Sequence, residues 1–195
     1  MNRPPPAFLR TWMLWTAGFL AFPIAGIAGN LTAGRVNDAL AALLGGVVTG
    51  AVLGAGQVLV SRRRLDPRTW IPATAIGMGL GLLLGATTVD YGTTLGDLAL
   101  MGTLTGAVLG PAQTLALSAK THQRWAWAAA LPILWALGWT VTTLGGISVE
   151  NQFTIYGAYG AITFAALSGL LLHHLLPYRA EAGPTPTQPR IATEV

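Results

Sequence analysis

Cysteine is absent from this chain, and charged residues are rare. The absence of cysteine excludes disulfides, thiolate nucleophiles and cysteine-ligated metal sites or clusters. Asp, Glu, Lys and Arg make up only 9% of the 195 residues, whereas about 25% is usual in a soluble domain. So few charges cannot coat a soluble protein whose composition is 52% apolar. We therefore interpret the chain as an integral membrane protein rather than as a soluble bundle of core helices.

Groups that usually perform chemistry inside a membrane are missing as well. No Asp, Glu, Lys or Arg lies near the middle of a long apolar segment, although ion-coupled transporters and proton relays usually need one there. The sequence also lacks an HExxH motif, a phosphate-binding loop and a Ser–His–Asp grouping. We expect no enzyme activity, no catalytic residue, no metal and no cofactor.

Two of the three histidines, His173 and His174, are neighbours, and His122 stands apart from them. Adjacent residues on a helix point about 100° apart, so this pair cannot share one metal site as two histidines four residues apart would. We favour histidines at the membrane interface, and a ligand for a metal or a pigment is the alternative.

What the sequence does contain is a series of apolar segments near the length that spans a hydrocarbon core of about 30 Å. They predict an all-α polytopic membrane protein with six transmembrane helices, at about residues 11–29, 39–61, 70–88, 98–119, 125–145 and 154–176. Pro23 should kink the first helix. That helix follows a basic head and so resembles a signal peptide, but it belongs to an internal repeat, and we expect it to be retained.

The helices divide the chain into three parts. Residues 1–10 form the basic head, and residues 178–195 form a Pro- and Thr-rich tail that we expect to be disordered. Residues 11–177 form the six-helix transmembrane domain, with repeats at about 11–64, 69–120 and 125–177.

The basic residues are concentrated on one side of the predicted membrane. Ten of the eleven Lys and Arg fall in the two termini and in the loops after the second and fourth helices: Arg3, Arg10, Arg62, Arg63, Arg64, Arg68, Lys120, Arg124, Arg179 and Arg190. The positive-inside rule therefore predicts that both termini are cytoplasmic. Tryptophans near the inner helix starts agree, because indoles favour the interface: Trp12, Trp15, Trp70, Trp125 and Trp127. Asp38 and Asp97 fall at outer helix ends, where a carboxylate suits a helix N-terminus.

Arg62, Arg63 and Arg64 have two compatible interpretations. The cluster can serve membrane topology alone, which we favour because the positive-inside rule needs such a cluster. It can also bind the anionic headgroups of membrane lipids. The excess of positive charge does not indicate nucleic-acid binding, because topology accounts for where the basic residues lie.

A glycine-rich sequence occurs twice, as GVVTGAVLGAGQ at 46–57 and GTLTGAVLGPAQ at 102–113, and a degraded copy, GAYGAITFAALS, spans 157–168. In each copy small residues recur at every fourth position: Gly46, Gly50 and Gly54, then Gly102, Gly106 and Gly110, then Gly157, Ala161 and Ala165. Such a glycine zipper lets helix backbones approach closely in lipid. We expect the three helices that carry it to pack around a pseudo-threefold axis, with the other three outside. Homodimerisation is the competing use of the same surface.

Trp15, Trp70 and Trp127 lie at the starts of the other three helices, and each precedes a glycine by eleven residues. The repeating unit is therefore a helix hairpin that occurs three times. Because each hairpin starts and ends on the same side, the three should be parallel and related by rotation about the membrane normal.

Gln57 and Gln113 end the first two glycine-rich copies, and Ser168 holds the corresponding position in the third. A buried amide in a membrane needs a hydrogen-bonding partner. The interpretation we favour is an interhelical hydrogen bond that holds the helices together. The alternative is a polar ring that lines a narrow pore or holds a headgroup.

These hairpins resemble those of a group of small bacterial multi-pass membrane proteins with Trp- and Gly-rich repeats and a G-x-x-x-G-x-x-Q motif. The matching residues are Trp15, Gly50, Gly54, Gln57 and Arg62 to Arg64 in the first repeat, then Trp70, Gly106, Gly110, Gln113 and Lys120. The chain departs from the pattern at Val58 and Thr114, where that group usually has Trp, and in the third repeat, which lacks the Gln. The resemblance implies the fold and a multi-pass location in the bacterial cytoplasmic membrane, and it implies no mechanism.

We expect a non-catalytic accessory, scaffold or assembly subunit of a larger membrane complex. Its partners would be membrane lipids with anionic headgroups and other membrane subunits, with a homo-oligomer as a further possibility and no nucleic acid. A small permease or channel for a neutral or weakly polar solute is the alternative function.

Overall fold

The computed structural model describes residues 7–62, 64–121, 123–147 and 154–175, and every regular element within them is helical. The elements are α1 (Ala7–Ala17), the 3₁₀ helix η1 (Gly18–Leu20), α2 (Ala21–Ala33), α3 (Ala39–Val60), α4 (Pro67–Thr88), α5 (Leu95–Ala116), α6 (Trp125–Leu144) and α7 (Ala158–Leu175). Six helical segments are long and apolar enough to cross a membrane. The predicted all-α class with six potential spans is confirmed. The predicted tail, Arg63 and His122 lie outside the described residues.

The first span, Phe8–Ala33, is made of α1, η1 and α2 in series. The 3₁₀ turn at Gly18–Leu20 interrupts the α-helical pattern about one turn before Pro23. Proline has no backbone N–H to donate to the carbonyl four residues earlier, which here belongs to Phe19. The local disturbance expected from Pro23 is therefore present, as a tightened turn.

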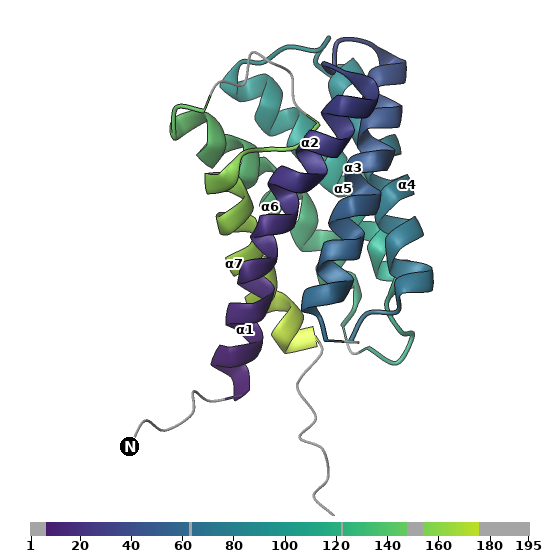
Figure 1. The fold of residues 1–195 in the computed structure, drawn as a ribbon, viewed down its shortest axis with the longest axis vertical. Coiled ribbons are helices and arrows are strands. Elements are labelled where there is room, and N and C mark those ends of the chain that lie inside the picture. Colours follow the sequence, from purple (N-terminus) through teal and green to yellow (C-terminus); the bar gives the residue numbers. More distant parts are fainter. Residues whose placement is uncertain (1–6, 63, 122, 148–153, 176–195) are drawn as a thin grey trace, which may run out of the picture.

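The helices form a ring in which each contacts the next along the chain, and α7 closes the ring against α1 (Figure 1). α1 begins and α7 ends at the same end of the bundle (Figure 1). Among the described residues α3, α5 and α7 do not pack backbone to backbone, so the expectation that they surround an axis with the other helices outside is wrong. The glycine-rich faces of α3 and α5 instead meet the first helix of the following hairpin, whereas in α7 Gly160 meets α6 of its own hairpin and Gly169 meets α1.

Short side chains define several helix starts. Asp38 caps α3 by accepting a hydrogen bond from the Ala41 N–H at 2.8 Å. Thr94 and Asp97 form a reciprocal capping box at the start of α5. The expectation that Asp38 and Asp97 suit helix N-termini is confirmed. Asp66 caps α4 in the same way, and because of these caps α4 and α5 begin three residues earlier than predicted.

The start of the last helix departs from the prediction of a helix from about residue 154. α7 begins at Ala158, and Thr154, Ile155 and Tyr156 are non-helical and at most 4% exposed. The Thr49 hydroxyl donates to the Thr154 hydroxyl at 2.7 Å, which ties this segment to α3. Residues 154–156 therefore fill the space between helices instead of extending α7.

Candidate functional site

Three equivalent hydrogen bonds join the hairpins near the end of the bundle where the chain begins. The indole Nε1 of Trp70 donates to Gln57 Oε1 at 2.9 Å, and that of Trp127 donates to Gln113 Oε1 at 2.9 Å. The indole of Trp15 donates to the Ser168 hydroxyl at 3.0 Å. Each bond connects the second helix of one hairpin with the first helix of the next, including the closing pair of α7 and α1.

These side chains meet across the ring. The Trp127 ring lies 6.1 Å from that of Trp70 and 6.5 Å from that of Trp15. The backbones of α1, α4 and α6 alternate around the ring and do not approach one another, so the side chains through which these helices touch occupy its interior. The Gln113 Nε2 donates to the Thr74 hydroxyl at 2.9 Å and, at 3.4 Å, to Gln57 Oε1. We call Trp15, Trp70, Trp127, Gln57, Gln113 and Ser168 the Trp–Gln cluster.

The Trp–Gln cluster is neutral and almost completely buried, at 5% exposure or less for every member. Its amide oxygens accept from indoles, and the Gln113 amide nitrogen finds acceptors on two other side chains. These contacts favour the interhelical-bond interpretation of Gln57 and Gln113 over a ring of amides facing a pore. Chemically, the cluster can hold helices in register, and it contains no group that titrates near neutral pH.

Sequence reasoning found the two glutamines but not their partners. It assigned Trp15, Trp70 and Trp127 to the membrane interface, and for these three the assignment is wrong, because they point into the bundle. Trp125, at 54% exposure, does face outward. A signal was present: each glutamine precedes a tryptophan by 13 or 14 residues, the distance across one short loop.

A second cluster of aromatic side chains fills the interior further along the axis. Tyr156 stacks on Phe22 at 5.4 Å and meets Trp135 at 5.0 Å and Trp139 at 5.9 Å, measured between ring centroids. Phe164 packs against the same group. The Tyr156 hydroxyl and the Trp135 Nε1 are buried without a hydrogen-bonding partner. Sequence reasoning did not identify this cluster, because no spacing rule links 154–156 to α2 and α6.

The predicted packing glycines lie at close backbone contacts. A Cβ atom at Gly46 would come within 2.8 Å of the Gly79 Cα, and one at Gly106 would come within 2.7 Å of the Pro132 Cα. The same restriction holds at Gly50, Gly102 and Gly110, whereas a Cβ at Gly54 would be less crowded, 3.1 Å from the Thr74 Cβ and 3.3 Å from the Ile71 Cα. In the third copy Ala161 and Ala165 are buried, and a Cβ at Gly157 would meet the side chains of Ile147 and Thr142.

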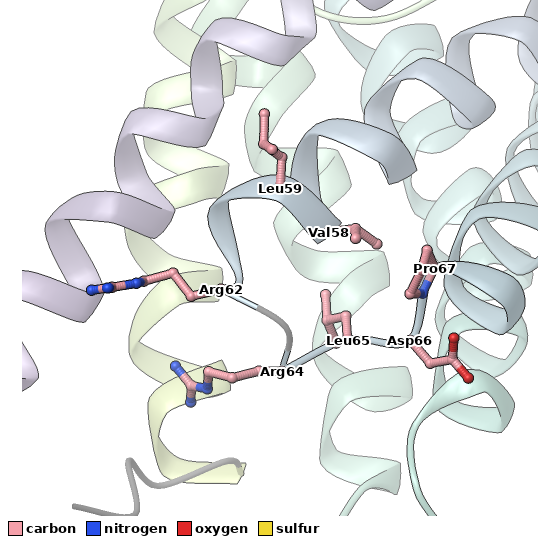
Figure 2. A pocket seen from close by; sticks show the side chains of 7 residues that line it. All are labelled: Val58, Leu59, Arg62, Arg64, Leu65, Asp66 and Pro67. Carbon is pink, nitrogen blue, oxygen red and sulfur yellow. The ribbon is translucent and has the colours of Figure 1, made fainter. Parts of the chain in front are cut away.

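The described arginines of the basic cluster, Arg62 and Arg64, line an open pocket between the end of α3 and the start of α4 (Figure 2). The other lining residues are Val58, Leu59, Leu65, Asp66 and Pro67. Burial lowers the pKa of Arg64, because desolvation penalises its charged form. The pocket is thus cationic on one side and apolar on the other.

The neighbouring histidines do not converge on a metal site in the part of the chain that the structure describes. The His173 ring instead packs against Phe8 of α1, with ring centroids 4.5 Å apart. This contact joins the last helix to the first.

No protein-family model, curated protein or solved structure matches this chain in the comparisons. The resemblance to small bacterial membrane proteins with Trp- and Gly-rich repeats therefore stays a prediction. What the chain can do has to be argued from its interior, its surface and the pocket beside Arg62.

Proposed function

We propose that this protein is a non-catalytic accessory or assembly subunit of a larger membrane complex in a bacterial cytoplasmic membrane. The observation that carries the proposal is the filled interior. The Trp–Gln cluster occupies the axis near one end, and the cluster around Tyr156 occupies it further along. A bundle with a filled interior can bind partners only on its outer surface. That surface carries exposed aliphatic side chains that can contact lipid or other transmembrane helices: Leu31, Leu59, Leu115, Ile133 and Leu144.

The arrangement we propose is three parallel hairpins with both termini in the cytoplasm. It is supported by the recurrence of one indole hydrogen bond at each of the three junctions between hairpins. It is also supported by the basic loops, since the described Arg62, Arg64, Lys120 and Arg124 all follow the second helix of a hairpin.

Single cysteines test this orientation cleanly, because the chain has none of its own. We expect a cysteine at Lys120 to resist an impermeant thiol reagent in intact cells and one at Thr93 to react. Both should react after the membrane is opened, which serves as the control. Reaction at position 120 from outside would reverse the orientation.

A small permease for a neutral solute is the second candidate. The observation that favours it is a group of buried polar atoms without partners, on Trp135, Thr142 and Tyr156. Two of these residues lie close to Gly138. A Cβ atom at Gly138 would contact the Tyr156 ring, and a Cβ atom at Gly160 would contact both the Gly138 carbonyl and the Thr142 hydroxyl. A polar solute moving along the axis could use these groups if residues 154–156 moved aside.

Purification from native membranes distinguishes the two candidates. The tagged protein, expressed at its natural level and extracted in mild detergent, should carry a partner in fixed stoichiometry. A variant with Leu31 and Leu144 changed to Ala would show whether the exposed aliphatic surface holds that partner. Recovery of the chain alone, together with solute flux by the pure protein in liposomes, would replace the accessory function with the permease.

A further inference from the structure

The pocket beside the α3–α4 loop lies at the level where lipid headgroups would meet the bundle. It lies where α3 ends at Val60 and α4 begins at Pro67, at the end of two membrane-spanning helices. Its volume of about 900 Å³ is within the range of small-molecule sites. Leu59, which is 81% exposed, faces outward just before the loop and extends the apolar wall along the span.

The charged side chains of the pocket point in two directions. Figure 2 shows the guanidinium groups of Arg62 and Arg64 on one side of the loop, while the Asp66 carboxylate points to the other side. Asp66 is also engaged in capping, since its Oδ1 accepts from the Arg68 N–H at 3.0 Å. The Asp66 carboxylate therefore does not occupy the space in front of the two guanidinium groups.

The backbone of the loop supports this placement. Arg62 has a φ of 53°, in the left-handed region that residues with a Cβ seldom adopt. An uncommon backbone conformation of this kind is retained where the surrounding structure holds it. Leu65, only 3% exposed, anchors the other end of the loop in the bundle. The two ends of the loop are thus defined by the backbone at Arg62 and by the burial of Leu65.

We propose that this pocket binds the phosphodiester headgroup of an anionic phospholipid, with Arg62 and Arg64 as the phosphate ligands. Guanidinium groups match phosphate oxygens in charge and in hydrogen-bonding geometry. Val58 and Leu59 would contact the acyl chains, a contact that a free phosphate ion cannot use.

The site is particular to the first junction between hairpins. In the next copy of the repeat, 56 residues later, Ser118 and Lys120 stand where Arg62 and Arg64 stand here. The loop there carries only Lys120 and Arg124 as described basic residues, and the Arg124 guanidinium lies over the Trp125 ring at 5.9 Å. A matched pair of substitutions in this second loop removes the same charge from the same side of the bundle without touching the pocket.

Native mass spectrometry of the full chain tests the proposal, with phosphatidylglycerol and phosphatidylcholine as lipids and inorganic phosphate as a separate ligand. The wild-type protein should retain one phosphatidylglycerol in preference to phosphatidylcholine. R62Q/R64Q should weaken that binding about 25-fold, since each basic group near an anionic lipid contributes about fivefold. K120Q/R124Q should leave it within about twofold, because these residues do not line the pocket and salt screens exposed charges that do not contact the lipid.

Each outcome decides the matter. Equal weakening by the two double variants would show general electrostatic attraction and overturn the site. Thermal stabilisation by inorganic phosphate as large as that by phosphatidylglycerol would identify a soluble anion as the ligand and overturn the lipid. If R62Q/R64Q does not fold, the single variant R62Q is measured instead, because the Arg62 side chain is exposed and its loss should not affect folding. We expect R62Q to weaken phosphatidylglycerol binding about fivefold. Unchanged binding by R62Q would then refute the assignment.

Discussion

The bond between Gln113 and Trp127 offers the most direct test of the buried cluster. In Gln113→Leu the Trp127 Nε1–H loses its acceptor while the indole stays fully buried. Thr74 loses an incoming bond, but its hydroxyl still donates to the Trp70 carbonyl at 2.8 Å. One orphaned buried donor costs about 1–3 kcal/mol of unfolding free energy. We expect Gln113→Leu to fall in this range.

A double-mutant cycle separates the bond from the packing. Trp127→Phe removes the donor and also leaves a cavity, so its own cost is larger. In the combined variant no donor is left without an acceptor, and the two costs should not add. The coupling energy should be about 1 kcal/mol, within the spread of measured hydrogen bonds between transmembrane helices, which average about 0.6 kcal/mol.

The assay is reversible unfolding of the purified protein in mixed detergent, followed by circular dichroism. Trp125→Phe is the matched control, because this indole is two residues away and 54% exposed, and we expect a change of less than about 0.5 kcal/mol. A coupling energy indistinguishable from zero would refute the bond. Wild-type stability of Gln113→Leu would refute the burial argument as well.

The double variant Gln57→Leu/Gln113→Leu follows from the same contacts. If the two amides bonded mainly to each other, removing both would be nearly neutral. They lie 3.4 Å apart, however, and each accepts a shorter 2.9 Å bond from an indole. We therefore expect two orphaned donors and a loss of about 2–6 kcal/mol. A loss below about 1 kcal/mol would show that the indoles have other acceptors.

Two further predictions concern the packing of the interior. Gly106→Ala should lower the yield of folded protein in detergent, because the new Cβ would lie 2.5 Å from the Leu131 carbonyl oxygen of the next helix and overpacking costs about 1–3 kcal/mol. Ala107→Leu, on the exposed side of the same helix, should not lower it. Tyr156→Phe should keep or raise the melting temperature, since it removes a buried hydroxyl without a partner, whereas Tyr159→Phe, at an exposed ring, should change nothing. A marked loss of stability in Tyr156→Phe would mean that the hydroxyl is bonded in the membrane.

The sequence by itself determined the class of the protein and the places where helices lie. Scarce charge and six long apolar segments leave only a membrane bundle, since a lipid core requires backbone hydrogen bonds to close within each helix. Local chemistry also determined several helix starts. Asp38 and the pair of Thr94 and Asp97 cap helices through side-chain bonds within three residues, which are readable from sequence alone.

Which face of each helix turns inward could not be read in the same way. In lipid both faces of a helix are apolar, so the hydrophobic pattern that separates inside from outside in a soluble protein carries little information. The glycine-rich faces were therefore found but assigned to the wrong neighbours. For the same reason the position of Trp70 and Trp127 at helix starts predicts interfacial side chains, although each lies at 0% exposure beside a glutamine.

Only the tertiary structure decided how the interior is filled. The two indole–amide bonds and the Trp15–Ser168 bond join residues of different hairpins, and the last of them depends on α7 closing the ring against α1. Residues 154–156 leave the helical path because Tyr156 packs there against Phe22, Trp135, Trp139 and Phe164, and Thr154 accepts a hydrogen bond from Thr49 of α3. Such contacts depend on the separation of helices that are remote in sequence, and that separation is determined by the close approach of backbones at Gly46, Gly106 and their equivalents.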